Sequence, residues 1–300
     1  MKTKLLSAAV FAFLIFNFAF STFGQGALTP PGAPAPTMRT LDQLDAKLEK
    51  RTPITSAPFT ITQSGSYYLT TNLTTATNGI IIVTNGVTLD LNGFTISSSA
   101  GAPNGYAAIL FASPVSDVSI FNGHIRGGVT NNGSGVYGGT GFSGGIDHVF
   151  GIPVNIHVSG VSVSGCLTYG INLATGDSTV VEACTIRTVG TTGISASTIK
   201  NSAAVDCGHF GIYGDQVSDC RGQSTAAIGG GGLTAIIAQN CYGQSTGGGT
   251  GLYAFDVATG CRGVSNTGLG LYAFIANSCR GTSTSGTALT VTHNVNSFFF

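Results

Sequence analysis

The residues best suited to catalysis form one loose group. Asp206, His209, Asp215 and Asp219 are the densest set of titratable side chains in this 300-residue chain. Glycoside hydrolysis needs at least two carboxylates at a suitable separation, and Asp206 with Asp215 or Asp219 meets that need only if the turns bring them together. The alternative is that these residues cap glycine-rich turns, where Asp tolerates left-handed backbone and hydrogen-bonds its own chain.

Aromatic residues that recur about 20 residues apart are better candidates for a binding surface. Tyr253 and Tyr272 stand in two identical Leu-Tyr-Ala-Phe segments, and Tyr213 holds the same place in an earlier repeat, with Thr234 between them. If these positions align on an exterior face, their rings can stack on sugar rings. The alternatives are that the row is covered, that it only improves packing between strands, or that it mediates self-association.

A second repeated position combines arginine with one tyrosine. Arg221, Arg262 and Arg280 each follow a cysteine in a Cys-Arg-Gly phrase, and Tyr242 takes the place of arginine in a fourth copy. Arginine pairs with carboxylates in bidentate geometry, so this row predicts contact with the uronate groups of a polysaccharide.

The charge balance excludes the nucleic-acid-binding class. The net charge is zero, and from Pro53 onward the chain has six basic and nine acidic residues, unlike the basic footprint of such proteins. The sequence contains no nucleophile elbow, phosphate-binding loop or metal-binding motif, so we expect no cofactor and no metal. The composition therefore favours a binding role over a catalytic one.

The chain has seven cysteines, five of which keep the repeat spacing: Cys207, Cys220, Cys241, Cys261 and Cys279. One inward cysteine per repeat places neighbours ~4.8 Å apart with parallel side chains, whereas a relaxed disulfide needs Cβ atoms ~3.8 Å apart. We therefore expect one ladder of free thiols that pack as small apolar side chains. Strained disulfides and metal binding are the alternatives, although the close cysteine pairs typical of zinc sites are absent.

The N-terminal residues predict export. Lys2 and Lys4 precede an apolar run from Leu5 to Phe20, which is typical of a signal peptide over residues 1–24. An uncleaved membrane anchor is the alternative, but the run is short for a span of ~20 residues, and no later stretch is apolar enough to cross a bilayer. We therefore expect a secreted or cell-surface protein. Residues 25–39 form a Pro-rich linker, and residues 40–52 predict a short helix that caps the following domain.

Two interleaved repeats predict that residues 53–300 form a parallel β-solenoid. A Gly-aliphatic pair recurs from Gly170-Ile171 to Gly270-Leu271 in steps of 18 to 23 residues, and the Cys-x-Gly-x-Ser phrase keeps the same period. Short strands that return at this period without a crossover helix must stack on one another. Earlier pairs at Gly79-Ile80, Gly105-Tyr106 and Gly135-Val136 are possible equivalents, and residues 138–145 predict a loop inserted in one turn.

Strand–Asn–Gly–strand segments carry a family resemblance. Leu89-Asp-Leu-Asn-Gly93 and Ile120-Phe-Asn-Gly123 resemble corners of the pectin-lyase-like right-handed β-helices. The resemblance implies an all-β, right-handed parallel β-helix with a short N-terminal capping helix. It implies little about activity: Cys207-Gly-His-Phe-Gly211 is similar to a Gly-His-Gly element of polygalacturonases, but their double-Asp and Arg-x-Lys elements have no match.

We therefore expect an exported, non-catalytic protein that contacts polysaccharide or cell-surface glycan through its tyrosine and arginine rows. A divergent polysaccharide lyase or glycoside hydrolase is the first alternative, and a structural surface or filament component is the second. The oligomeric state is not predicted.

Overall fold

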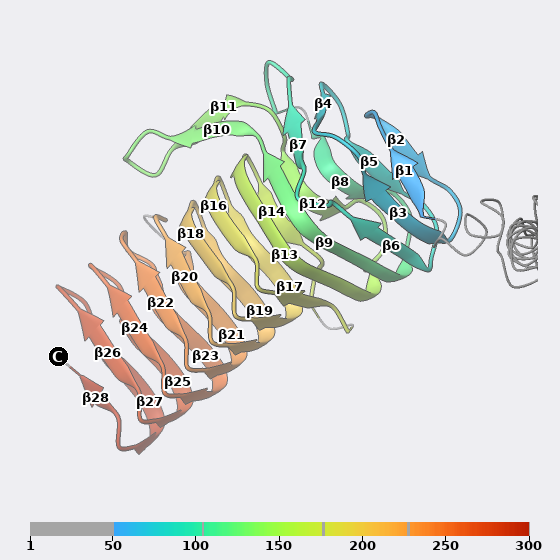
Figure 1. The fold of residues 1–300 in the computed structure, drawn as a ribbon. Helices are drawn as coiled ribbons and strands as arrows, with labels where there is room; N and C mark the ends of the chain where they lie inside the picture. Colours follow the sequence, from blue (N-terminus) through green and yellow to red (C-terminus); the bar gives the residue numbers. More distant parts are fainter. Residues whose placement is uncertain (1–50, 104, 176–177, 227–228, 300) are drawn as a thin grey trace, which may run out of the picture. The chain divides into compact units, whose positions relative to one another are not determined.

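The computed structural model describes residues 51–103, 105–175, 178–226 and 229–299. The expected signal peptide, linker and residues 40–50 of the capping helix lie outside the described residues, and Thr52, where that helix should end, instead begins a strand. The described chain is an all-β parallel solenoid of the right-handed type (Figure 1). Among these described residues, no helix is long and apolar enough to span a membrane.

The strands of successive turns stack into three faces, A, B and C, and all solenoid pairs are parallel. Face A consists of β2 (Phe59–Ile61), β5 (Ile80–Ile82), β8 (Ala107–Phe111), β12 (Gly144–His148), β14 (Tyr169–Asn172) and the first halves of β17 (Thr192–Lys200), β19 (Phe210–Ser218), β21 (Gly231–Gln239), β23 (Thr250–Thr259), β25 (Leu271–Asn277) and β27 (Leu289–Val295). Face B consists of β1 (Thr52–Ile54), β3 (Gly65–Leu69), β6 (Val87–Asp90), the first halves of β9 (Ser116–Arg126) and β13 (Val154–Cys166), β15 (Val180–Glu182) and the second halves of β17 to β27. Face C consists of β4 (Leu73–Thr75), β7 (Thr95–Ser98), the second halves of β9 and β13, β16 (Thr185–Val189), β18 (Ala203–Cys207), β20 (Arg221–Ser224), β22 (Tyr242–Ser245), β24 (Arg262–Ser265), β26 (Arg280–Ser283) and β28 (Phe298–Phe299).

The Gly-aliphatic repeat supplies one inward row of face A. The strand register stacks its aliphatic residues one above another, in the order Ile80, Ile109, Ile146, Ile171, Ile194, Ile212, Leu233, Leu252 and Leu271. All are fully buried, as expected when alternate residues of a strand face the core. The equivalence of Ile80 is confirmed, but Tyr106 and Val136 are wrong assignments, because Ile109 and Ile146 occupy those turns.

The inward row of face C becomes smaller toward the C-terminus. It runs from Ile125 through Val163, Ile186 and Ala204 to Gly222, and the following turns keep glycine. A Cβ atom on Gly243 would lie only 2.2 Å from the carbonyl oxygen of Gly251 on face A. The glycine of the Cys-x-Gly-x-Ser phrase therefore packs against the glycine of the Gly-aliphatic pair. This contact explains why the two repeats share one period.

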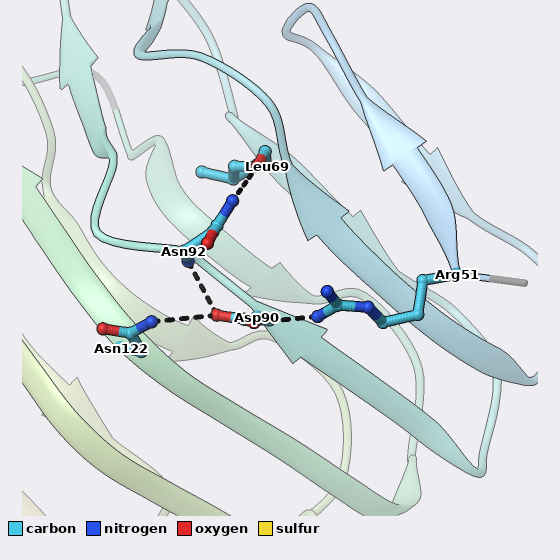
Figure 2. A network of polar contacts seen from close by, with 5 residues as sticks. All are labelled: Arg51, Leu69, Asp90, Asn92 and Asn122. Atoms are coloured by element: carbon cyan, nitrogen blue, oxygen red, sulfur yellow. Dashed lines mark hydrogen bonds and ion pairs between the residues drawn. The ribbon is translucent and has the colours of Figure 1, made fainter. Parts of the chain in front are cut away.

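The corner between faces B and C repeats a left-handed residue in successive turns. Asn92, Asn122, Asn201, Asp219 and Asn240 have φ between 47° and 62° there, a region that Asn and Asp tolerate better than most residues. At the N-terminal end, Asp90 holds this corner (Figure 2) by accepting hydrogen bonds from the Asn92 amide (2.7 Å), the Asn122 side chain (3.3 Å) and Arg51 (2.9 Å).

The insertion expected at residues 138–145 is instead a β-hairpin that begins earlier. β10 (Gly128–Asn131) and β11 (Tyr137–Thr140) pair antiparallel and project from the stack (Figure 1). The glycines that suggested a loop lie partly in β11, because glycine-rich sequence carries too little side-chain pattern to distinguish a strand from a loop.

All seven cysteines are free and buried, as predicted. The prediction of one ladder is wrong, because the cysteines occupy two rows. Five cysteines follow the left-handed corner: Cys184, Cys220, Cys241, Cys261 and Cys279. The Cys261 and Cys279 Sγ atoms each accept a hydrogen bond from the backbone amide of the preceding cysteine in this row (3.4 Å). Cys166 and Cys207 instead align with Ser224 at the other end of face C. The repeat period alone does not distinguish these two inward positions.

Candidate functional site: an aromatic groove on face A

The tyrosine row is confirmed by the strand register. Tyr213 pairs with Thr234, Thr234 with Tyr253, and Tyr253 with Tyr272, all pointing outward between inward aliphatic and small residues. The Tyr253 and Tyr272 rings stack with centres 4.4 Å apart and planes within 12°. Burial, and to a lesser extent Tyr272, raises the pKa of Tyr253.

A groove of about 340 Å³ opens between Tyr213 and Tyr253. Phe210 accompanies Tyr213 on one side (ring centres 5.5 Å apart), and Phe255 accompanies Tyr253 on the other (4.8 Å). Thr234 lies between the two aromatic pairs, and the glycines of residues 229–231 and 248–249 complete the lining. None of the lining side chains carries a charge, so the groove presents aromatic surface and backbone polar groups.

The groove continues toward the N-terminus into a second depression of about 280 Å³. Phe210 and Tyr213 line both depressions, and the second adds Tyr169, Asn172, Thr192, Ser195 and His209. The His209 ring packs edge-on against Phe210 with ring centres 4.1 Å apart. His209, expected as a catalytic candidate, is therefore part of the aromatic wall.

The arginine row lies on face C, on different strands from the tyrosine row. Arg221, Tyr242, Arg262 and Arg280 are in consecutive register, as predicted. The guanidinium groups of Arg221 and Arg262 flank the Tyr242 ring, each 5.6 Å from its centre. These cation–π contacts give Tyr242 a structural role, because they hold two like charges on opposite sides of one ring.

Asp206 anchors the β10–β11 hairpin. Its Oδ1 atom accepts hydrogen bonds from the Asn131 amide (2.6 Å) and the Tyr137 hydroxyl (2.8 Å), and Oδ2 accepts one from Thr188 (2.8 Å). Burial raises the pKa of Tyr137, and the neighbouring Asp206 adds to that shift, so the phenol remains a donor. Both carboxylate oxygens of Asp206 are therefore engaged in hydrogen bonds within the protein.

The four catalytic candidates do not line one site. Asp206 borders the depression beneath the hairpin, His209 the second part of the aromatic groove, and Asp219 a depression on face C. Asp219 is exposed at the left-handed corner and accepts a hydrogen bond from Asn240 (3.2 Å). Asp215 follows Tyr213 by two residues on β19. Among the described residues no group of three or more His, Cys, Asp or Glu side chains could hold a metal ion.

Two components of the groove were not foreseen from the sequence. Phe210 precedes Tyr213 by three residues, outside the strict alternation that placed the tyrosines. The glycine runs at residues 229–232 and 247–249 were given no role, although the absence of side chains at residues 229–231 and 248–249 leaves the groove open. The available signal in the sequence was that two glycine runs recur one repeat apart, each shortly before a position of the tyrosine row.

Comparison with known proteins leaves the chain without an assigned family. No protein-family profile matches it, and no curated protein is significantly similar to it. Among solved structures, the enzymatically active domain of tailspike protein 2 from bacteriophage CBA120 is similar with a TM-score of 0.40 and 14% identity, covering 76% of this chain. The match spans 38% of that tailspike domain. Similarity at this level carries no argument about activity, so the site has to be interpreted from its own geometry.

Proposed function

We propose that the protein is an exported, non-catalytic β-solenoid that binds polysaccharide in the aromatic groove of face A. The observation that carries this proposal is the uncharged groove bounded by two aromatic pairs, Phe210 with Tyr213 and Tyr253 with Phe255. Sugar rings have apolar faces that pack on aromatic rings and hydroxyl edges that hydrogen-bond to backbone groups. Export is inferred from the N-terminal sequence, and membership of the pectin-lyase-like superfamily from the Asn–Gly corners.

The arginine row is proposed to contribute only where the polysaccharide carries acidic groups. Arg221, Arg262 and Arg280 lie on face C, so a chain bound in the groove of face A meets them only by passing around a corner of the solenoid. Neutral polysaccharide is therefore the first ligand to test.

A polysaccharide lyase or hydrolase is less well supported. Both oxygens of Asp206 already accept hydrogen bonds, Oδ1 from Asn131 and Tyr137 of the hairpin and Oδ2 from Thr188. Asp219 lines a different depression. An acid–base pair needs two carboxylates that face one bond, and these residues lack that arrangement.

The test is a pull-down of the purified protein on insoluble neutral polysaccharides, with released sugar measured in the same tubes. We expect retention without release, and a loss of at least about tenfold in affinity for Tyr253→Ala combined with Tyr272→Ala, since interface aromatics each contribute about 1 kcal/mol or more. Tyr242→Ala, an aromatic change on face C, is the matched control and should leave retention unchanged.

Two results would contradict the proposal. Sugar release that disappears in Asp215→Asn would identify an enzyme. Absence of retention on every polysaccharide tested, with a correctly folded protein, would leave a structural surface role as the better account.

A further inference from the structure

The tyrosine row on face A lacks one ring. Tyr213, Tyr253 and Tyr272 occupy three of four consecutive positions, and Thr234 occupies the fourth. Where two tyrosines are adjacent, their rings fill the space between neighbouring strands by stacking at 4.4 Å. Thr234 therefore leaves one layer of the row unfilled, and we name the gap above it the Thr234 slot, bounded by Tyr213 and Tyr253.

The width of the slot matches one ring. Tyr213 and Tyr253 are two strands apart, and strands are spaced ~4.8 Å, so the two ring layers are separated by roughly 10 Å. A ring placed midway lies roughly 5 Å from each tyrosine, within the range of favourable stacking distances. The groove volume of about 340 Å³ is at the small end for ligand sites and agrees with one sugar residue and its substituents.

The lining of the slot defines the chemistry of that ring. Thr234 lines the groove and is 7% exposed. The walls are aromatic, and the remaining lining is glycine and Thr250. Apolar ring faces, hydroxyls at the ring edge and no charge are the properties that fit, because the lining offers no cation to pair with a carboxylate.

We propose that the Thr234 slot binds a single neutral pyranose ring, inserted between Tyr213 and Tyr253 with one edge toward the Thr234 hydroxyl. This inference rests on the proposed polysaccharide binding and makes it specific: the recognised unit is one neutral sugar residue, and the rest of the polysaccharide contributes contacts outside the slot. The slot excludes uronate residues, which places any recognition of acidic groups on the arginine row.

The decisive variant is Thr234→Tyr. A tyrosine at this position extends the stacked row and fills the slot with a ring of the protein itself, so the fold is retained while the ligand is displaced. We expect at least a tenfold loss of polysaccharide affinity. The matched control is Thr234→Ser, which keeps the hydroxyl and the open slot and should bind within about twofold of the natural protein.

A second variant narrows the slot from its glycine side and keeps the test valid if Thr234→Tyr folds poorly. A Cβ atom on Gly231 would lie 3.2 Å from the Thr250 carbonyl oxygen, 3.3 Å from Thr234 Oγ1 and 3.7 Å from Phe210 Cδ1. Gly231→Ala should therefore weaken binding several-fold, and the comparison is made at a temperature where urea unfolding shows the variant to be fully folded, because the Thr250 carbonyl has to shift slightly. Saturation-transfer NMR with free glucose, galactose and mannose provides a direct probe, with glucuronate as the charged counterpart that should give no transfer.

The outcomes separate the two proposals. Polysaccharide retention that survives both Thr234→Tyr and Gly231→Ala would overturn the slot while leaving the binding function intact. Transfer to glucuronate equal to that of glucose would overturn its neutral specificity. If the natural protein retains no polysaccharide, the binding function fails and the slot proposal fails with it.

Discussion

Asp90 shows how single residues hold the turns of the solenoid together. Its carboxylate is buried and accepts hydrogen bonds from its own strand corner, from Asn122 one turn further along and from Arg51 (Figure 2). Arg51 also lies over the Tyr68 ring, 4.8 Å from its centre. Asp90 lies in one of the Asn–Gly corner segments, and its partners Asn122 and Arg51 are distant from it in sequence.

Replacing Asp90 should destabilise the N-terminal turns. In Asp90→Ala, the Asn92 amide and the Asn122 side chain lose a charged acceptor. Both residues are exposed, so water replaces part of the loss, and the net cost should be about 1–2 kcal/mol. Asp90→Asn keeps one acceptor oxygen and should cost less, and Arg51→Ala, which removes a half-exposed ion pair, should cost no more than about 1 kcal/mol. Urea unfolding followed by circular dichroism ranks the three variants, and equal losses for all three would refute this account.

At the scale of strands, the close contact between faces A and C determines which residues the C-terminal half of the solenoid can carry at its inward positions. A Cβ atom on Gly263 would lie 2.2 Å from the carbonyl oxygen of Gly270, and one on Gly251 would lie 2.4 Å from the amide nitrogen of Val264. The two strands approach so closely that neither position has room for a side chain. The pairing repeats in neighbouring turns, so the glycines are a packing requirement of this half.

Gly263→Ala should therefore strain the strand contact. The added methyl group has to displace backbone, because no flexible side chain can yield, and overpacking of this kind costs about 1–3 kcal/mol or more. Gly101→Ala is the matched control, since a Cβ atom there meets nothing within 4 Å and the backbone is compatible with alanine. Thermal unfolding of both variants measures the difference, and the same melting temperature for both would contradict the close approach.

The strand positions were predictable from the sequence to the extent that the repeat was regular. From Gly170 onward two residue types recur per turn, and both the inward aliphatic row and the outward tyrosine row were placed correctly. The earlier turns failed at Tyr106 and Val136 because the β10–β11 hairpin and longer loops interrupt the spacing there. Of the groove, the tyrosines were predicted but Phe210 and the lining glycines were not. The opening of the groove depends on where side chains are absent, and the repeat spacing does not indicate this.

At the scale of the whole molecule, the buried thiols link stability to pH. Burial raises the pKa of Cys166 to about 12 and those of Cys184 and Cys220 to about 11. An unfolded cysteine has a pKa of about 8.5. Between these values the folded chain keeps thiol protons that the unfolded chain releases, so the thiols favour the fold below pH ~8.5 and that contribution is lost as the pH rises through the folded values.

The free energy of unfolding should therefore be nearly constant between about pH 6 and 8 and fall above pH ~9, by on the order of 3–5 kcal/mol for each fully titrated thiol. Urea unfolding under reducing conditions at a series of pH values measures this slope. Combining Cys166→Ala, Cys184→Ala and Cys220→Ala removes three of the seven thiols. This triple variant starts less stable, because three small cavities are created. Its alkaline slope should nevertheless be shallower than that of the natural protein, since slope and starting stability have separate physical origins. An unchanged slope would assign the alkaline sensitivity to other groups, such as the half-buried Tyr137, and would show that the cysteine rows contribute packing alone.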